Sequence, residues 1–134
     1  MIYKKKGLVF SIDVLIFMLV VTCFIYVGVV KGTDIINSSR NDRAIAETAS
    51  IGALVSEYRQ EVGSYPKNLD ALKTASGQYG PWLKEVPKDP WNPGSQYKYK
   101  YTTTGYAVYS VGKNKKDNSS ATAIGSGNLG FVGK

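Results

Sequence analysis

The side chains that most often carry out chemistry in proteins are scarce in this chain of 134 residues. It has no histidine, and its one cysteine, Cys23, lies within a long apolar stretch. Catalytic Ser-His-Asp and Cys-His arrangements, histidine-containing zinc sites and an intramolecular disulfide are therefore excluded. The carboxylates that stand out are Asp13 in the apolar stretch, and Asp89 and Asp117 further along the chain. The sequence indicates a structural or binding protein rather than an enzyme.

The apolar stretch from Leu8 to Val30 positions Asp13, which is its only charged residue. As a helix it would span about 35 Å at about 1.5 Å per residue, which exceeds the roughly 30 Å hydrocarbon core of a bilayer. Three lysines at positions 4–6 precede it, which favours a cytoplasmic N-terminus. The net charge of +7 includes these lysines and is too modest to indicate a nucleic-acid partner. We therefore expect a single-pass protein of the cytoplasmic membrane with one small domain outside the bilayer.

The residues KKKGLVFSID resemble the head of type IV prepilins, which is a short basic leader ending in glycine before an apolar helix. The resemblance implies that prepilin peptidase cuts between Gly7 and Leu8 and that the new amino terminus is methylated. Asp13 would then be the sixth mature residue, whereas the family usually has a glutamate at the fifth. A cut after Leu8 would restore that spacing but would not follow a glycine.

Two interpretations of Asp13 are open. A carboxylate at the centre of a membrane helix costs about 2.5–3.5 kcal/mol, and such residues usually have a partner. Asp13 lies near the start of the stretch, so it could simply reach the headgroup layer. The resemblance to pilins implies instead that Asp13 pairs with the free amino terminus of a neighbouring subunit. In that case Asp13 is an assembly residue.

An apolar stripe at helical spacing follows the membrane segment. It predicts an amphipathic helix that packs one face on a small domain and ends at Gly63-Ser64-Tyr65-Pro66. We therefore divide the chain into a leader (1–7), a membrane or assembly half of a helix (8–30), an amphipathic half (31–62) and a globular domain (63–134). The stripe consists of Ala44, Thr48, Ile51, Val55, Tyr58 and Val62.

The globular part shows a short helix and two strands. Asn68 is expected to cap the helix, and residues 97–101 and 106–111 are expected to form a hairpin through a turn at 102–105. A last strand is expected near residues 129–132. The run Tyr-Lys-Tyr-Lys-Tyr at 97–101 could stack nucleic-acid bases, but its alternation favours tyrosines buried against the helix stripe. The fold class is α+β, a long N-terminal helix packed on a small antiparallel sheet.

The globular half resembles the major pseudopilins of type II secretion systems. The matching stretches are SYPKNLDAL, WLKEVPKDPWNPGSQYKY and GYAVYSVGKN, which lie between residues 64 and 114. The second stretch predicts a rigid loop, because proline fixes φ and a tryptophan can anchor it. Its structural residues are Pro87, Asp89, Pro90, Trp91 and Pro93.

The resemblance also implies a calcium site in the loop after the second strand. Asp117 is the one carboxylate in KNKKDNSS and the residue to test, with Asn114 and Asn118 beside it. Calcium takes six to eight oxygen ligands, and three lysines in this loop oppose it. We therefore expect no cofactor, with calcium at Asp117 as the alternative. The sequons at Asn37 and Asn118 would accept glycan in a suitable host.

Together these features imply a structural subunit of a pilus or pseudopilus, held in the cytoplasmic membrane until it joins a helical filament used in type II secretion. Its partners would be copies of itself, prepilin peptidase, a membrane assembly platform and, before assembly, the lipid bilayer, with no nucleic acid. After assembly it would lie in a periplasmic or extracellular filament. A type IV or competence pilus subunit is an alternative. A monomeric membrane-anchored module that binds DNA or an anionic surface is another.

Overall fold

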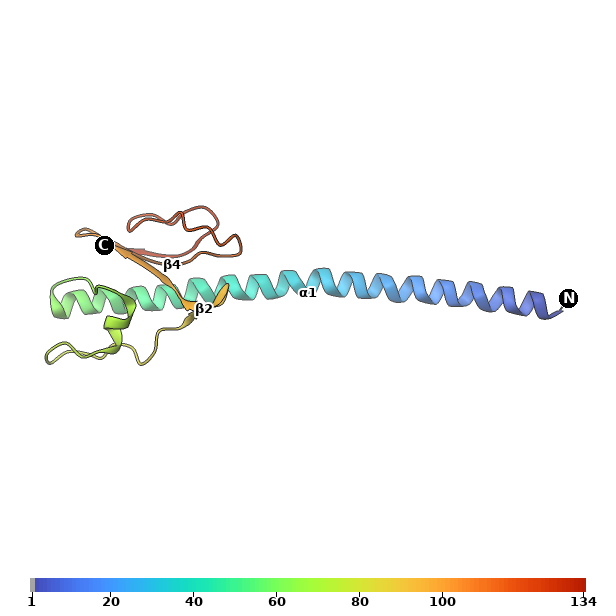
Figure 1. Cartoon of the computed structure of the whole chain (residues 1–134), viewed down its shortest axis with the longest axis horizontal. Helices are drawn as coiled ribbons and strands as arrows, with labels where there is room; N and C mark the ends of the chain where they lie inside the picture. The colour runs from blue at the N-terminus through green and yellow to red at the C-terminus, as the bar shows by residue number, and fades with distance from the viewer. Residues whose placement is uncertain (1) are drawn as a thin grey trace. The chain divides into compact units, whose positions relative to one another are not determined.

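The computed structural model describes the backbone of residues 2–134 and the side chains from Ser11 onward. The chain divides into two compact units, residues 1–38 and 39–134, and each is described by itself. Helix α1 (Ile2–Val62) forms the described part of the first unit and begins the second (Figure 1). The remaining elements all belong to the second unit.

From Ser11 onward, the first unit presents many exposed apolar side chains on its helix. Phe24 is 75% exposed, and Leu15, Phe17 and Leu19 are each 67% exposed. By length and composition this part of α1 could cross a membrane. A contiguous apolar surface of this extent is covered by lipid or by other protein in a stable assembly.

The second part of α1 buries one stripe of side chains. Ala44, Thr48 and Val55 are fully buried and Ile51 nearly so, which confirms the predicted amphipathic face. Thr48 fits in this stripe because its hydroxyl donates to the carbonyl of Ala44 at 2.7 Å within the same helix. The helix ends where Gly63 takes a φ of 90°, a left-handed conformation that glycine adopts at little cost.

A short 3₁₀ helix, η1 (Leu69–Lys73), follows α1. Its cap is Asn68, whose side-chain oxygen accepts a hydrogen bond from the amide of Ala71 at 2.9 Å, as the sequence predicts. Leu69 and Leu72 of η1 are buried in the core. The element therefore contributes two leucines to the core of the second unit.

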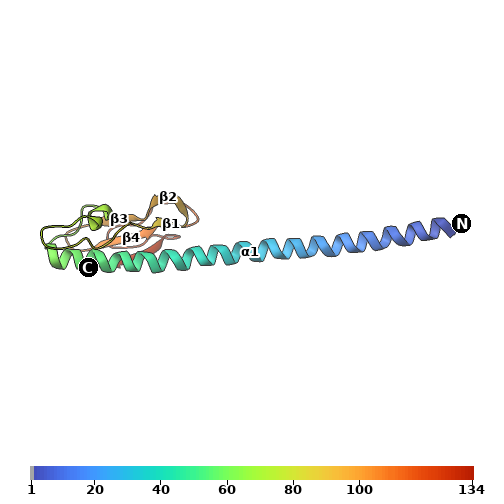
Figure 2. The same cartoon turned by 90° about the horizontal axis from the view of Figure 1, so that it is seen from below.

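Five strands complete the second unit, in two antiparallel sheets alongside the C-terminal part of α1 (Figure 2). The order β3-β4-β5 confirms the predicted hairpin and last strand, and the turn is closed by a 2.7 Å hydrogen bond from the amide of Thr102 to the carbonyl of Gly105. The separate β1-β2 ribbon was not predicted, because its prolines interrupt any alternation. The strands are β1 (Lys88–Asp89), β2 (Asn92–Gln96), β3 (Lys98–Tyr101), β4 (Tyr106–Ser110) and β5 (Leu129–Gly133).

Tyrosines of the hairpin pack against the α1 stripe. Tyr97 and Tyr106 are buried, and Tyr99 is half-buried beside them, as the alternation predicts. Tyr101 differs, because it lies at the end of β3 and is 44% exposed. Since Tyr97 and Tyr99 are used in the core, the run at 97–101 does not present three tyrosines as a stacking surface for bases.

Replacing Tyr99 by phenylalanine should leave the free energy of unfolding unchanged or raise it by about 1 kcal/mol. Within the described part of the chain, the hydroxyl of Tyr99 is the buried side-chain polar atom that lacks a hydrogen-bond partner, and burying such a group is costly. Thermal unfolding of the full chain in detergent measures the effect. Tyr97→Phe is the matched control and should be destabilising, because the hydroxyl of Tyr97 donates to Glu47 at 2.5 Å. A Tyr99→Phe protein less stable than Tyr97→Phe would contradict this view.

Candidate functional site

The predicted assembly residue Asp13 lies on the exposed surface of the first unit, on α1. It is surrounded along the helix by apolar side chains that are themselves exposed, such as Ile12 and Leu15. The predicted processing residues Gly7 and Leu8 fall in the backbone of α1, and their side chains lie outside the described residues. Asp13 is therefore an exposed carboxylate on an exposed apolar stretch of the helix.

The predicted structural loop is built around the buried carboxylate of Asp89, which is 2% exposed. Its Oδ1 atom accepts hydrogen bonds from the amide of Trp91 at 2.9 Å and from the hydroxyl of Ser110 at 2.7 Å. The first bond closes the turn between β1 and β2, and the second ties that ribbon to the end of β4. Asp89 is therefore a structural link between the two sheets.

Trp91 fastens the same loop to α1. Its ring is nearly buried, and its Nε1 donates to Asn41 at 3.1 Å. The guanidinium of Arg40 lies over the ring, 5.4 Å from its centre, which adds a cation–π contact. Pro87 and Pro90 are half-buried beside it and Pro93 is exposed.

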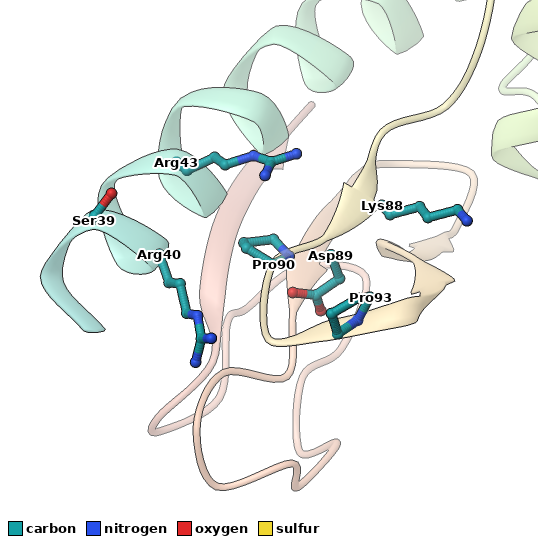
Figure 3. A pocket seen from close by; sticks show the side chains of 7 residues that line it. All are labelled: Ser39, Arg40, Arg43, Lys88, Asp89, Pro90 and Pro93. Atoms are coloured by element: carbon teal, nitrogen blue, oxygen red, sulfur yellow. The ribbon is translucent and has the colours of Figure 1, made fainter. Parts of the chain in front are cut away.

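A pocket of about 240 Å³ lies between α1 and the β1-β2 ribbon of the second unit (Figure 3). Figure 3 shows Arg40 and Arg43 on the helix, with the ribbon residues Asp89 and Pro90 facing them. Both arginines are engaged within the chain, since Arg40 lies on Trp91 and Arg43 binds Glu47 at 2.8 Å. Arg40 thus helps to hold the loop at Trp91 on the helix, whereas Arg43 is paired within α1. Ser39, Lys88 and Pro93 complete the lining.

Glu47 is a structural residue that the sequence patterns do not single out. Its two carboxylate oxygens accept from Arg43 and from the hydroxyl of Tyr97. Burial, reinforced by the Glu47 carboxylate, raises the pKa of Tyr97, so its hydroxyl remains a donor. Tyr97 and Glu47 are brought together only by the tertiary fold, so no local pattern in the sequence predicts their contact.

The predicted metal residue Asp117 lies in the loop between β4 and β5 and already has partners. Its Oδ1 accepts from the hydroxyl of Tyr109 at 2.7 Å and from the ammonium of Lys100 at 3.1 Å. These two donors lower the pKa of the Asp117 carboxyl. Among the described residues, no group of three or more His, Cys, Asp or Glu side chains could hold a metal ion.

A protein-family model described as "Type II secretion system (T2SS), protein G" matches residues 32–126, which is well over half of the chain. The chain belongs to this family. It is thus a major pseudopilin, a structural subunit of the secretion pseudopilus and not an enzyme. No match was found among curated proteins or among solved structures.

The matched range contains every residue through which the pseudopilin resemblance was drawn, from Tyr65 to Gly112. The fold agrees with it, as a long apolar helix is followed by small antiparallel sheets. Among the pilus systems that the basic leader left open, the match selects type II secretion.

Proposed function

We propose that this pseudopilin is held in the cytoplasmic membrane by residues 8–30, with its N-terminus in the cytoplasm, and then assembles with copies of itself into a helical fibre. The observation that carries the proposal is the exposed apolar surface of the first unit from Ser11 onward, in a chain of a pseudopilin family. Such a surface needs lipid before assembly and neighbouring helices after it. The fibre would lie in the periplasm or outside the cell.

Processing would precede assembly. Prepilin peptidase would cut between Gly7 and Leu8 on the cytoplasmic side, and the new amino terminus would be methylated. The freed amino group is then the natural partner for the carboxylate of Asp13 on a neighbouring subunit. Extraction of an apolar helix from lipid into protein brings little net hydrophobic gain. A membrane platform driven by ATP would therefore move the subunits.

The proposal is tested by expressing the full chain in cells that carry a type II secretion system. We expect filaments sheared from these cells to contain the protein, and its N-terminal sequence to begin at Leu8. Gly7→Val should retain Met1 and be absent from the sheared fraction, because the peptidase site is lost. A wild-type chain that keeps Met1 and stays a monodisperse membrane monomer would contradict the proposal.

A further inference from the structure

The loop between β4 and β5, residues 111–128, is contacted by a charged side chain from another strand. It is longer than most connections in compact domains and forms no helix or strand. It nevertheless buries Ser119 and Ala121, so it is a packed part of the second unit. The loop contains a single acidic side chain, Asp117.

The charged group is the ammonium of Lys100. It reaches the loop from β3, the strand on the other side of β4. Its Nζ donates to the backbone carbonyl of Ser119 at 2.8 Å and to Oδ1 of Asp117 at 3.1 Å. It also lies 5.6 Å from the centre of the Tyr109 ring, and the hydroxyl of Tyr109 donates to the same Asp117 oxygen.

These contacts have the chemistry of a small cation site. A carboxylate oxygen and a backbone carbonyl are typical calcium ligands, and here both converge on one positive charge. That charge is a lysine ammonium, which has three donors and no acceptor and acts as a point charge. With these oxygens in use and one carboxylate in the whole loop, the residues present do not fit a calcium ion.

We propose that the ammonium of Lys100 takes the place of a bound cation in the loop of residues 111–128, so that this pseudopilin folds without calcium. The charge is supplied by the chain itself and does not depend on the ion concentration outside the cell. The ion pair between Lys100 and Asp117 persists at neutral pH. Tyr109 and Lys100 lower the pKa of Asp117, so its contribution to stability is present above the usual value of 3.8 and is lost as the pH falls through the lower folded value.

The first test replaces Lys100 by methionine, which keeps the length of the side chain and removes the charge. We expect the melting temperature of the full chain in detergent to fall by about 4–8 °C, and the amides of residues 112–127 to exchange faster with solvent. Lys98→Met is the matched control, because Lys98 lies on the same strand and is exposed. Equal melting temperatures and equal loop exchange for Lys100→Met and Lys98→Met would overturn the proposal.

The second test measures the wild-type chain with and without calcium. A calcium site occupied at about a hundred times its dissociation constant would raise the melting temperature by about 10 °C or more. We expect no shift between a chelator and about 5 mM calcium chloride, and unchanged loop exchange. A calcium-dependent rise in melting temperature together with slower exchange in residues 112–127 would show that an ion, and not Lys100, organises the loop.

Discussion

Replacing Asp13 by alanine should lower the yield of sheared filaments at least about tenfold and leave the amount of protein in the membrane unchanged. A carboxylate in a membrane helix costs about 2.5–3.5 kcal/mol at the centre, so a chain that carries one must recover that free energy elsewhere. Pairing with the amino terminus of a neighbouring subunit would recover it only in the filament. Because each 1.4 kcal/mol is a factor of ten, losing about half of that contribution already lowers assembly about tenfold.

The measurement compares the sheared fraction with the membrane fraction by immunoblot. Asp34→Ala is the control, since Asp34 is also an exposed acid on α1 but lies beyond the apolar stretch. Asp13→Glu keeps the charge and should retain most of the assembly, which separates charge from packing. An Asp13→Ala subunit that enters filaments as well as wild type would leave Asp13 as a residue that merely reaches the headgroup layer.

The sequence predicts the parts of the fold whose side chains repeat with a regular period within one helix or strand. The stripe from Ala44 to Val55 repeats at helical spacing, and the buried face follows from it. The hairpin likewise follows from alternation on both sides of a turn at Thr102–Gly105. In both cases the signal lies within one element, so no knowledge of distant contacts is needed.

Contacts between distant residues could not be predicted in this way. Tyr97 donates to Glu47, and Tyr106 packs on α1 so closely that its hydroxyl donates to the carbonyl of Gly52. At Gly52 a side chain would also collide with Phe131, since an added Cβ would lie 2.3 Å from its ring. Each contact links residues that only the tertiary fold brings together. A single sequence contains no pattern for them.

The contacts of the loop of residues 111–128 likewise could not be predicted from the sequence. Alternation in the run at 97–101 places the lysines in solvent, and this is correct for Lys98. The side chain of Lys100 is also 43% exposed, but its ammonium is bound to Ser119 and Asp117, which alternation does not predict. The loop also contains three lysines of its own, Lys113, Lys115 and Lys116, and all three are exposed. The positive charge that contacts Asp117 comes from Lys100 on β3, so closeness in the sequence does not identify it.

Replacing Asp89 by alanine should lower the free energy of unfolding by about 3 kcal/mol, the largest loss of stability expected from a single carboxylate in the second unit. The substitution leaves the amide of Trp91 and the buried hydroxyl of Ser110 without their acceptor. Each buried group left unsatisfied costs about 1–3 kcal/mol. The Asp89→Ala substitution also opens a cavity between the two sheets. The melting temperature of the full chain in detergent should fall by more than about 10 °C.

Two further variants show whether the hydrogen bonds or the charge of Asp89 matter. Asp89→Asn retains an oxygen that can accept from Trp91 and Ser110, so about two-thirds of the loss should be avoided, leaving about 1 kcal/mol. Asp70→Ala is the control for removing an acid, because the side chain of Asp70 is 54% exposed and pairs only at the surface with Lys73 and Gln96. It should cost less than about 1 kcal/mol. If Asp89→Asn were as damaging as Asp89→Ala, the negative charge would be essential, and the neighbouring Arg40 and Arg43 would become its partners across the pocket.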